Sequence, residues 1–337
     1  MLCITIAYAK PQQKENRVAQ CSVHLPLIFN QEPKLKDLFA NHGIRFGFAV
    51  GENTFVDAPW NETRRRLVIW HADVVSTGSE LNMAFTQPVE GTFDWSKVDK
   101  IVSGANEFGI SVHGIPASWG LDALNPTWLV DGTWTDEQLS SILKEHVNEL
   151  AAHYDGKFVS LDVANEAWIT GFDPVYGGVW EPLGDDYVYI SFESAKGHKY
   201  PVLYNSYFPE PSDIERNKAL KLVEDGVADG IGIQLHLWTG DWEATLDKTE
   251  DFLKQIRAVG GWCRFSEIGI LAVDDDEWAQ AIVYAAVTRL AIEYSDIVRD
   301  FVVWGVKDPA WRGNTTLFDE QGQPKPAYYA IINELRK

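Results

Sequence analysis

The chain has few cysteines and no long apolar run. Its 337 residues include Cys3, Cys21 and Cys263, an odd number from which no disulfide framework can be predicted. Cys263 opens an apolar segment and is expected to be a small buried residue. No apolar stretch approaches the roughly 18 residues that a membrane-spanning helix needs, so no membrane span is expected.

Basic residues are also scarce. Lysine and arginine number 29 against 49 aspartates and glutamates, which gives a net charge of −20. A surface of that sign repels polyanions, so nucleic acid is not an expected partner. A neutral substrate incurs no such repulsion.

Several common catalytic motifs are missing. No GxGxxG follows an early strand, which disfavours a doubly wound nucleotide-binding sheet. The eight histidines form neither HExxH nor a Cys/His cluster, so neither a metal nor another cofactor is expected. There is no GxSxG elbow, which disfavours a Ser-His-Asp hydrolase.

Short apolar segments alternate with stretches of helical periodicity along most of the chain. Longer helical patterns occupy 96–109, 135–154 and 277–295, and Thr135 and Gln138 have the spacing of a capping box. Eight segments rich in β-branched and aromatic residues predict strands at 45–50, 67–75, 111–117, 158–164, 201–207, 230–237, 263–270 and 301–306. Eight strand–helix units predict an α/β protein with a (β/α)8 TIM barrel.

We expect one catalytic barrel domain over residues 36–337, because no linker or low-complexity tract interrupts it. Residues 1–35 form an N-terminal extension. Its start, MLCITIAYA, ends in a small-x-small pattern but lacks a basic beginning. It is either the remnant of a signal peptide or a segment that packs on the barrel floor. The protein is expected to be a monomer.

Polar residues follow the predicted strands at the end of a barrel where active sites form. Asn-Glu occurs five times, but only Asn165-Glu166 follows a buried strand. Glu267 likewise lies in an apolar strand, where an unpaired charge is costly, so the alternative for it is a structural salt bridge. His236 lies one strand away, where it could orient Glu267 or simply be a core histidine.

Two glutamates on opposite sides of a barrel mouth suit retaining glycoside hydrolysis, which needs carboxyl groups about 5–5.5 Å apart. Glu166 would be the general acid/base and Glu267 the nucleophile. Some of the fourteen tryptophans support a sugar substrate, because flat apolar rings pack against sugar rings. They are the ones that follow predicted strands, namely Trp119, Trp168, Trp238 and Trp304. The alternative is that they belong to a large core.

From about Phe46 to Tyr328 the sequence resembles glycoside hydrolase family 10, best known for endo-β-1,4-xylanases. The strongest stretches are FVSLDVANEAW, GIGIQLHL, FSEIGI, VVWGVKDPAWR and LFDEQGQPKPAY, in the family's order. The resemblance implies that Glu166 is the acid/base and Glu267 the nucleophile.

The same resemblance implies roles for the residues around the two glutamates. Asn165 would hold the 2-hydroxyl of the sugar being cleaved, and His236 would orient Glu267. The remaining substrate-binding residues that it implies are Asn205, Tyr207, Gln234, Trp119, Trp304 and Trp311.

The sequence departs from the family where xylanases grip the glycone sugars. Their Glu-Asn-x-x-Lys residues align with Gly78, Ser79 and Asn82, so Asn82 is the one expected to face substrate. A family histidine after strand 3 is absent, and Gly269 replaces an aspartate after the nucleophile. Lost hydrogen bonds to a sugar could each cost ~1.5–3 kcal/mol.

Three hypotheses follow from the sequence. The first is a xylanase with a rebuilt glycone site, acting on a β-linked polysaccharide or oligosaccharide, with xylan favoured. The second is a retaining hydrolase of another β-glycan or β-glycoside, and the third is a non-catalytic sugar-binding protein. A polymer substrate favours a secreted or cell-surface protein, although an intracellular enzyme for imported oligosaccharides fits as well.

Overall fold

A computed structural model describes residues 32–168, 178–207 and 213–337. The segment MLCITIAYA, Cys3 and Cys21 lie outside the described residues. Residues Pro33–Lys337 form one compact unit. Among the described residues, no helix combines the length and the apolar character needed to cross a membrane.

Eight parallel strands close into a barrel, which confirms the predicted fold. In space they follow the order β3-β2-β1-β9-β8-β7-β6-β5, and a parallel pairing of β3 with β5 closes the ring. A two-residue strand, β4 (Ser118–Trp119), adds to the end of β5. The barrel strands are β1 (Arg45–Ala49), β2 (Val74–Ser76), β3 (Ser111–Gly114), β5 (Ser160–Asn165), β6 (Val202–Ser206), β7 (Gly230–Trp238), β8 (Cys263–Leu271) and β9 (Val298–Val303).

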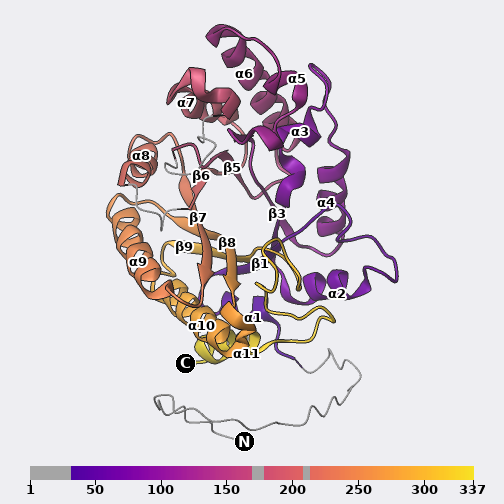
Figure 1. Cartoon of the computed structure of the whole chain (residues 1–337), viewed down its shortest axis with the longest axis vertical. Helices are drawn as coiled ribbons and strands as arrows, with labels where there is room; N and C mark the ends of the chain where they lie inside the picture. The colour runs from indigo at the N-terminus through magenta and orange to yellow at the C-terminus, as the bar shows by residue number, and fades with distance from the viewer. Residues whose placement is uncertain (1–31, 169–177, 208–212) are drawn as a thin grey trace, which may run out of the picture. The chain divides into compact units, whose positions relative to one another are not determined.

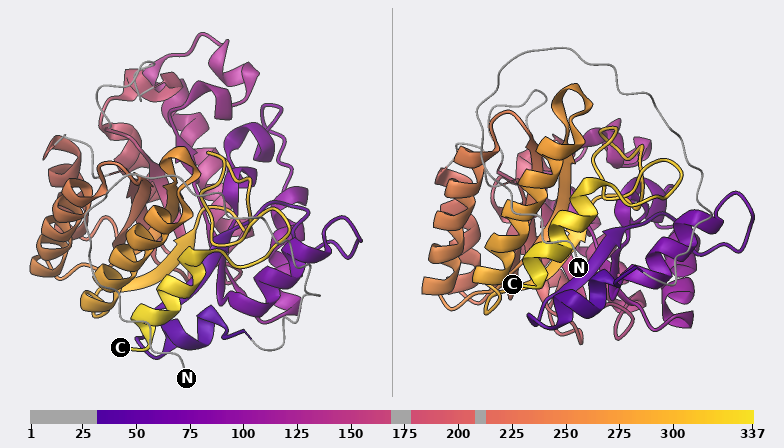
Figure 2. Two further views of the ribbon diagram at one scale, coloured as in Figure 1. Left: turned by 60° about the horizontal axis from the view of Figure 1, so that its bottom comes forward. Right: turned by 90° about the horizontal axis from the view of Figure 1, so that it is seen from below.

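Helices surround the strands (Figure 1). Helix α11 lies beside α10 at the last part of the ring, as both views of Figure 2 show. The helices are α1 (Leu35–Ala40), α2 (Glu62–His71), α3 (Met83–Thr86), α4 (Ser96–Glu107), α5 (Thr127–Val130), α6 (Asp136–His153), α7 (Asp186–Ala195), α8 (Asp213–Glu224), α9 (Trp242–Ala258), α10 (Glu277–Glu293) and α11 (Pro326–Leu335).

Local sequence signals explain where the long helices begin. Thr135 accepts a hydrogen bond from the backbone N–H of Gln138, and the Gln138 side chain accepts one from the backbone N–H of Thr135, so the predicted capping box of α6 is confirmed. Asp276 caps α10 by accepting from the amides of Trp278 and Ala279. Both caps satisfy amide groups that would otherwise lack partners in the first helical turn.

The predicted strand at 67–75 is wrong over most of its length. Residues 67–71 belong to helix α2, and only Val74–Ser76 form a strand. Leu67, Val68 and His71 are buried, and their spacing of one and four residues is that of a helix face. A short apolar run cannot by itself distinguish a buried strand from a buried helical turn.

The end of the barrel opposite the active site is closed by aromatic rings and one buried ion-pair cluster. Phe39 of α1 packs on Phe46 and Phe301, with ring centroids 5.3 and 4.8 Å away. Asp300 is fully buried and accepts from the guanidinium groups of Arg45 and Arg264. Burial disfavours the charge of Asp300, but the two arginines outweigh it and hold the pKa of this carboxyl below its usual value.

Candidate active site

Glu166 and Glu267 lie at the carboxyl side of the barrel among polar side chains from four neighbouring strands. Both are buried, with exposed fractions of 9% and 6%. Glu166 follows the last residue of β5, and Glu267 pairs in register with Gln234 across β7 and β8. We call Glu166, Glu267, Asn165, Asn205, Gln234 and His236 the carboxylate cluster.

Both oxygens of Glu267 receive hydrogen bonds. Asn205 Nδ2 donates to Oε1 over 2.9 Å, and His236 Nε2 lies 3.2 Å from Oε2, where it donates if the ring proton is on that nitrogen. The Ser266 hydroxyl donates to Asn205 Oδ1 over 2.6 Å, which turns the Asn205 amino group towards Glu267. Two donors and no acceptor suit a charged carboxylate in this position.

Glu166 is in a different electrostatic environment. Burial and then the negative charge of Glu267 raise the pKa of Glu166 to about 8. Gln234 Nε2 donates to Glu166 Oε1 over 2.7 Å, so a proton on this carboxyl belongs on Oε2. At neutral pH the site therefore holds one protonated and hydrogen-donating carboxyl group beside Glu267.

Asn165 connects the two glutamates through its side-chain oxygen. That oxygen accepts from Asn205 Nδ2 over 2.8 Å and from Gln234 Nε2 over 3.3 Å. The Asn165 side chain also hydrogen-bonds the Glu166 carboxyl, which acts against the rise of the Glu166 pKa. An amide amino group has two N–H donors, so one of them remains for a substrate hydroxyl.

The backbone turn at Glu166 is unusual. Glu166 has a φ of 52°, in the left-handed region that residues other than glycine seldom adopt. Its amide donates to the carbonyl oxygen of Asn205 over 2.9 Å, and the next amide, of Ala167, donates to the Tyr204 hydroxyl over 2.8 Å. Two residues of strand β6 therefore fix this turn by binding the consecutive amides of Glu166 and Ala167.

Two glycines leave room for the cluster. A Cβ atom at Gly232 would lie 2.2 Å from Asn205 Oδ1, so a larger residue there would displace Asn205. A Cβ at Gly269 would lie 3.2 Å from His236 Nδ1, directly beside the ring. At this position, where the resembling family has aspartate, glycine therefore places no carboxylate against His236.

Aromatic rings form the wall next to the cluster. The ring centroid of His236 lies 6.5 Å from that of Trp304 and 5.2 Å from that of Trp311. Trp311 is 64% exposed, and the Arg312 guanidinium lies 4.3 Å from its ring centroid. The Tyr207 hydroxyl donates to the carbonyl oxygen of His236 over 3.3 Å. Trp304, Trp311 and Tyr207 thus lie beside the carboxylate cluster, and their contact with substrate stays a prediction.

Trp119 and Asn82 are less directly connected. Trp119 pairs with Asn165 in the sheet, and its indole nitrogen is buried without a partner among the described residues. Asn82 is buried, and its amino group donates to the carbonyl oxygen of Ser79 over 2.8 Å, inside its own turn. Asn82 has no hydrogen bond to the carboxylate cluster among the described residues.

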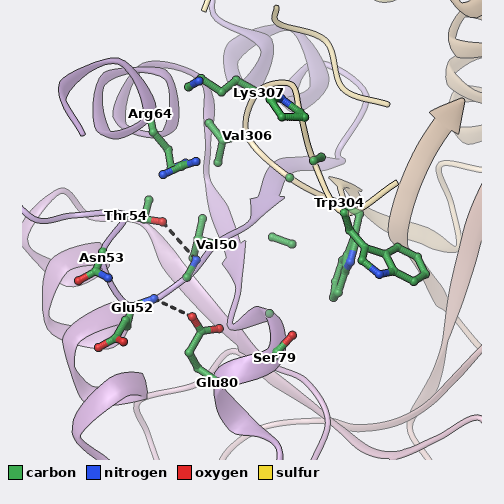
Figure 3. Close-up of a pocket in the computed structure, with 17 residues that line it drawn as sticks. Val50, Glu52, Asn53, Thr54, Arg64, Ser79, Glu80, Trp304, Val306 and Lys307 are labelled. Atoms are coloured by element: carbon green, nitrogen blue, oxygen red, sulfur yellow. Dashed lines mark hydrogen bonds between the residues drawn. The ribbon is translucent and has the colours of Figure 1, made fainter. Parts of the chain in front are cut away.

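Sequence reasoning missed a cavity of about 440 Å³ that Trp304 and Trp311 help to line. It opens between the loops that follow β1, β2 and β9, with Arg64 of α2 reaching into it (Figure 3). Its residues are spread over four segments of the sequence, and although the stretch VVWGVKDPAWR and the aligned Gly78 and Ser79 belong to two of them, no motif marks Arg64 or residues 49–54. We call this space the charged cavity; its lining comprises Ala49–Thr54, Arg64, Gly78–Glu80, Trp304–Lys307 and Pro309–Trp311.

A third buried glutamate was also missed. Glu215 of α8 is only 3% exposed and accepts hydrogen bonds from Tyr204 and Ser206 of β6. Its sequence neighbours, DIERN, read as the solvated first turn of a helix. Asp308, by contrast, accepts hydrogen bonds from the backbone amide of Thr316 and from the Lys325 ammonium group, so it stabilises the loop between β9 and α11.

The sequence profile of Glycosyl hydrolase family 10 matches residues 34–334. The chain is 26% identical to endo-1,4-beta-xylanase B of Thermotoga neapolitana over 332 residues, which cover 90% of this chain and 91% of that protein. An endo-1,4-beta-xylanase of Geobacillus stearothermophilus is likewise 26% identical, with 89% and 98% covered.

Solved structures give the same result. Xylanase 10B from Thermotoga petrophila RKU-1, crystallised with xylobiose, superposes with a TM-score of 0.82 at 25% identity. The match covers 91% of this chain and 98% of that one.

Proposed function

Since the chain belongs to glycosyl hydrolase family 10, we propose that it cleaves the β-1,4-xylosidic bonds of xylan or xylo-oligosaccharides with retention of configuration. The observation that carries the proposal is the difference between its two central carboxyl groups. Glu166 has a pKa of about 8, whereas Glu267 accepts two hydrogen bonds from fixed donors. Retaining hydrolysis needs this division into an acid and a nucleophile.

In the first step Glu267 attacks the anomeric carbon while the proton on Glu166 Oε2 passes to the leaving oxygen. Asn205 and His236 hold the attacking carboxylate in one orientation. One amino hydrogen of Asn165 is donated to a hydroxyl of the sugar being cleaved. Trp304 and Trp311 stack against the sugars on the glycone side.

The second step follows from the same electrostatics. Once Glu267 is an ester its negative charge is gone, and with it one of the causes that raise the pKa of Glu166. Glu166 therefore becomes a better base at the moment when it must remove a proton from the incoming water. One carboxyl group thus serves as acid and then as base.

The relatives named as xylanases support the choice of substrate. Release of reducing sugar from beechwood xylan by the purified protein tests it, with Glu267→Ala as the inactive control. NMR of the first product should show the β-anomer before mutarotation. A folded protein that leaves xylan intact but hydrolyses another β-glycan would overturn the substrate; an α-anomer as first product would overturn the mechanism.

A further inference from the structure

The charged cavity contains two cationic side chains that have no carboxylate partner in the part of the chain that the structure describes. Arg64 makes no hydrogen bond or ion pair among the described residues. Lys307 donates to the backbone carbonyl of Glu320 over 2.7 Å and has no further hydrogen bond within the described ranges. In a chain with 49 acidic and 29 basic residues, two cations without a carboxylate partner that line the same cavity make that cavity suited to an anion.

The acidic residues of the same cavity are already occupied. Glu52 forms an ion pair with Lys100 at 2.8 Å. Glu80 accepts from the backbone amide of Glu52 over 2.9 Å, and burial raises the pKa of Glu80. Figure 3 places the two glutamates on the side of the cavity away from Lys307. The wall formed by Arg64 and Lys307 is therefore favourable to an anion.

The position of the cavity restricts what that anion can be. Trp304 and Trp311 line it, and both rings also lie next to His236, which contacts Glu267. A group held by Arg64 must therefore belong to the same sugar chain that reaches Glu267. Asn53 and Thr54, also in the lining, add polar groups suited to sugar hydroxyls.

Building on the proposed function, we propose that the charged cavity binds a uronic acid substituent carried by the xylan chain on the glycone side of the cleaved bond. The carboxylate lies between Arg64 and Lys307, and the sugar that carries it packs near Trp304. The enzyme therefore prefers acid-decorated xylan to undecorated xylan.

The test compares kcat/KM for xylohexaose and for the same oligosaccharide bearing one glucuronic acid. The wild-type enzyme should prefer the decorated substrate, and mass spectrometry should find the acid on the glycone product. Arg64→Met should lower the ratio of the two kcat/KM values about tenfold, as expected for one partly screened charge-assisted contact. The preference should also weaken as salt is raised, since the contact is partly exposed.

Arg66→Met is the matched control, because Arg66 lies on the same helix, pairs with Glu62 and does not line the cavity. Its ratio should equal that of the wild type. An equal ratio in Arg64→Met, or a wild-type enzyme indifferent to the acid, would overturn this inference while leaving the xylanase function intact. A wild-type enzyme inactive on both oligosaccharides would instead contradict the proposed xylanase function.

A separate observation concerns Glu215, beneath the turn that aims Glu166. The Tyr204 hydroxyl donates to Glu215 over 2.6 Å and accepts from the amide of Ala167 over 2.8 Å. The backbone amide of Trp168 also interacts with Glu215. Glu215 thus controls both amides that follow Glu166, directly or through one hydroxyl group.

We infer that Glu215 is a positioning residue that holds the left-handed turn at Glu166 and acts on its proton affinity. The groups that face Glu215 are Tyr204, Ser206, Tyr187 and Glu166. Burial raises the pKa of Glu215 to about 7, so it is mostly charged near pH 8. Its charge there favours the protonated form of Glu166.

Two variants separate these effects. Glu215→Gln keeps an acceptor for Tyr204 but removes the charge, so kcat should fall about tenfold and the alkaline limb of the pH–rate profile should move to lower pH. Tyr204→Phe breaks the link to Ala167 but leaves the charge, so kcat should fall without that movement. Glu224→Gln, an exposed change on the same helix, should alter neither.

A merely structural Glu215 would give a different pattern. Glu215→Gln would then lower the melting temperature while kcat and the alkaline limb stayed as in the wild type, and the inference would be wrong. An alkaline limb that moved equally in Tyr204→Phe would also contradict it, because that variant keeps the charge.

Discussion

The carboxylate cluster and the charged cavity both adjoin Trp304 and Trp311 but are built differently. The cluster comes from adjacent strands β5 to β8, and its side chains bond mainly to one another. The cavity comes from the loops after β1, β2 and β9 and from helix α2, and two of its cations have no carboxylate partner among the residues that the structure describes. A reaction needs fixed geometry, whereas substrate choice can change with the loops.

Glu267→Ala should have the largest effect. Loss of the nucleophile should reduce kcat by about 10⁴-fold or more, because no other group can form the covalent intermediate. The rate on an aryl β-xyloside measures it, with the exposed Glu243→Ala as control. Added azide should restore turnover and give a product of inverted configuration. Residual activity near that of the wild type would mean that the nucleophile lies elsewhere.

Glu166→Ala should reduce hydrolysis of xylan by about 10²–10⁴-fold, the usual contribution of general acid catalysis. The loss in the first step should be far smaller for a dinitrophenyl xyloside, because its leaving group needs no proton. The ratio of the two losses identifies the acid. Equal losses on both substrates would mean that Glu166 binds substrate and does not donate the proton. The carboxylate cluster would then contribute to substrate binding, as the charged cavity does.

The pH dependence should show an alkaline limb. Glu166 must be protonated to act as the acid, and its pKa is about 8, so kcat/KM should fall as pH rises through about 8, approaching tenfold per unit. Measurement from pH 5 to 10 on xylohexaose tests this. Glu166 also favours the folded state below its unfolded pKa, and this stabilisation is lost as pH rises through about 8. A limb near pH 5 would contradict the assignment.

Asn82→Ala should have the smallest effect. Its amide is used inside its own turn, so kcat/KM on xylan should change by less than about threefold, with a stability loss of ~1 kcal/mol for the missing hydrogen bond. Thermal unfolding and initial rates measure the two quantities separately. A loss of a hundredfold would show that this loop contributes to the reaction and would break the division between cluster and cavity.

The barrel and its central pair could be predicted because their signals are local. Glu166 follows a recognisable buried strand. The alternation of eight strands with helices along the sequence predicts the closed barrel. The strand at 67–75 failed because Leu67 and Val68 are apolar in either structure. Periodicity over five residues does not separate the two.

The cavity and Glu215 could not be predicted, because both depend on distant segments meeting. Arg64 is one of three consecutive arginines, and nothing in the sequence tells which of them turns inwards. Glu215 sits in an ordinary acidic first turn of α8, and its burial arises only when α8 packs on β6. Alignment places Asn82 at a gripping position, whereas its amino group donates inside its own turn, so its contact with substrate stays a prediction.

The left-handed backbone of Glu166 has a consequence for heat resistance. A residue with a Cβ atom loses ~1–2 kcal/mol in that conformation, which glycine would not. Glu166 also stays buried close to another carboxylate. Replacing it with glycine should therefore make the protein harder to melt as it abolishes turnover. Selection for thermal tolerance alone would drive this position away from glutamate, and only selection for hydrolysis would keep it.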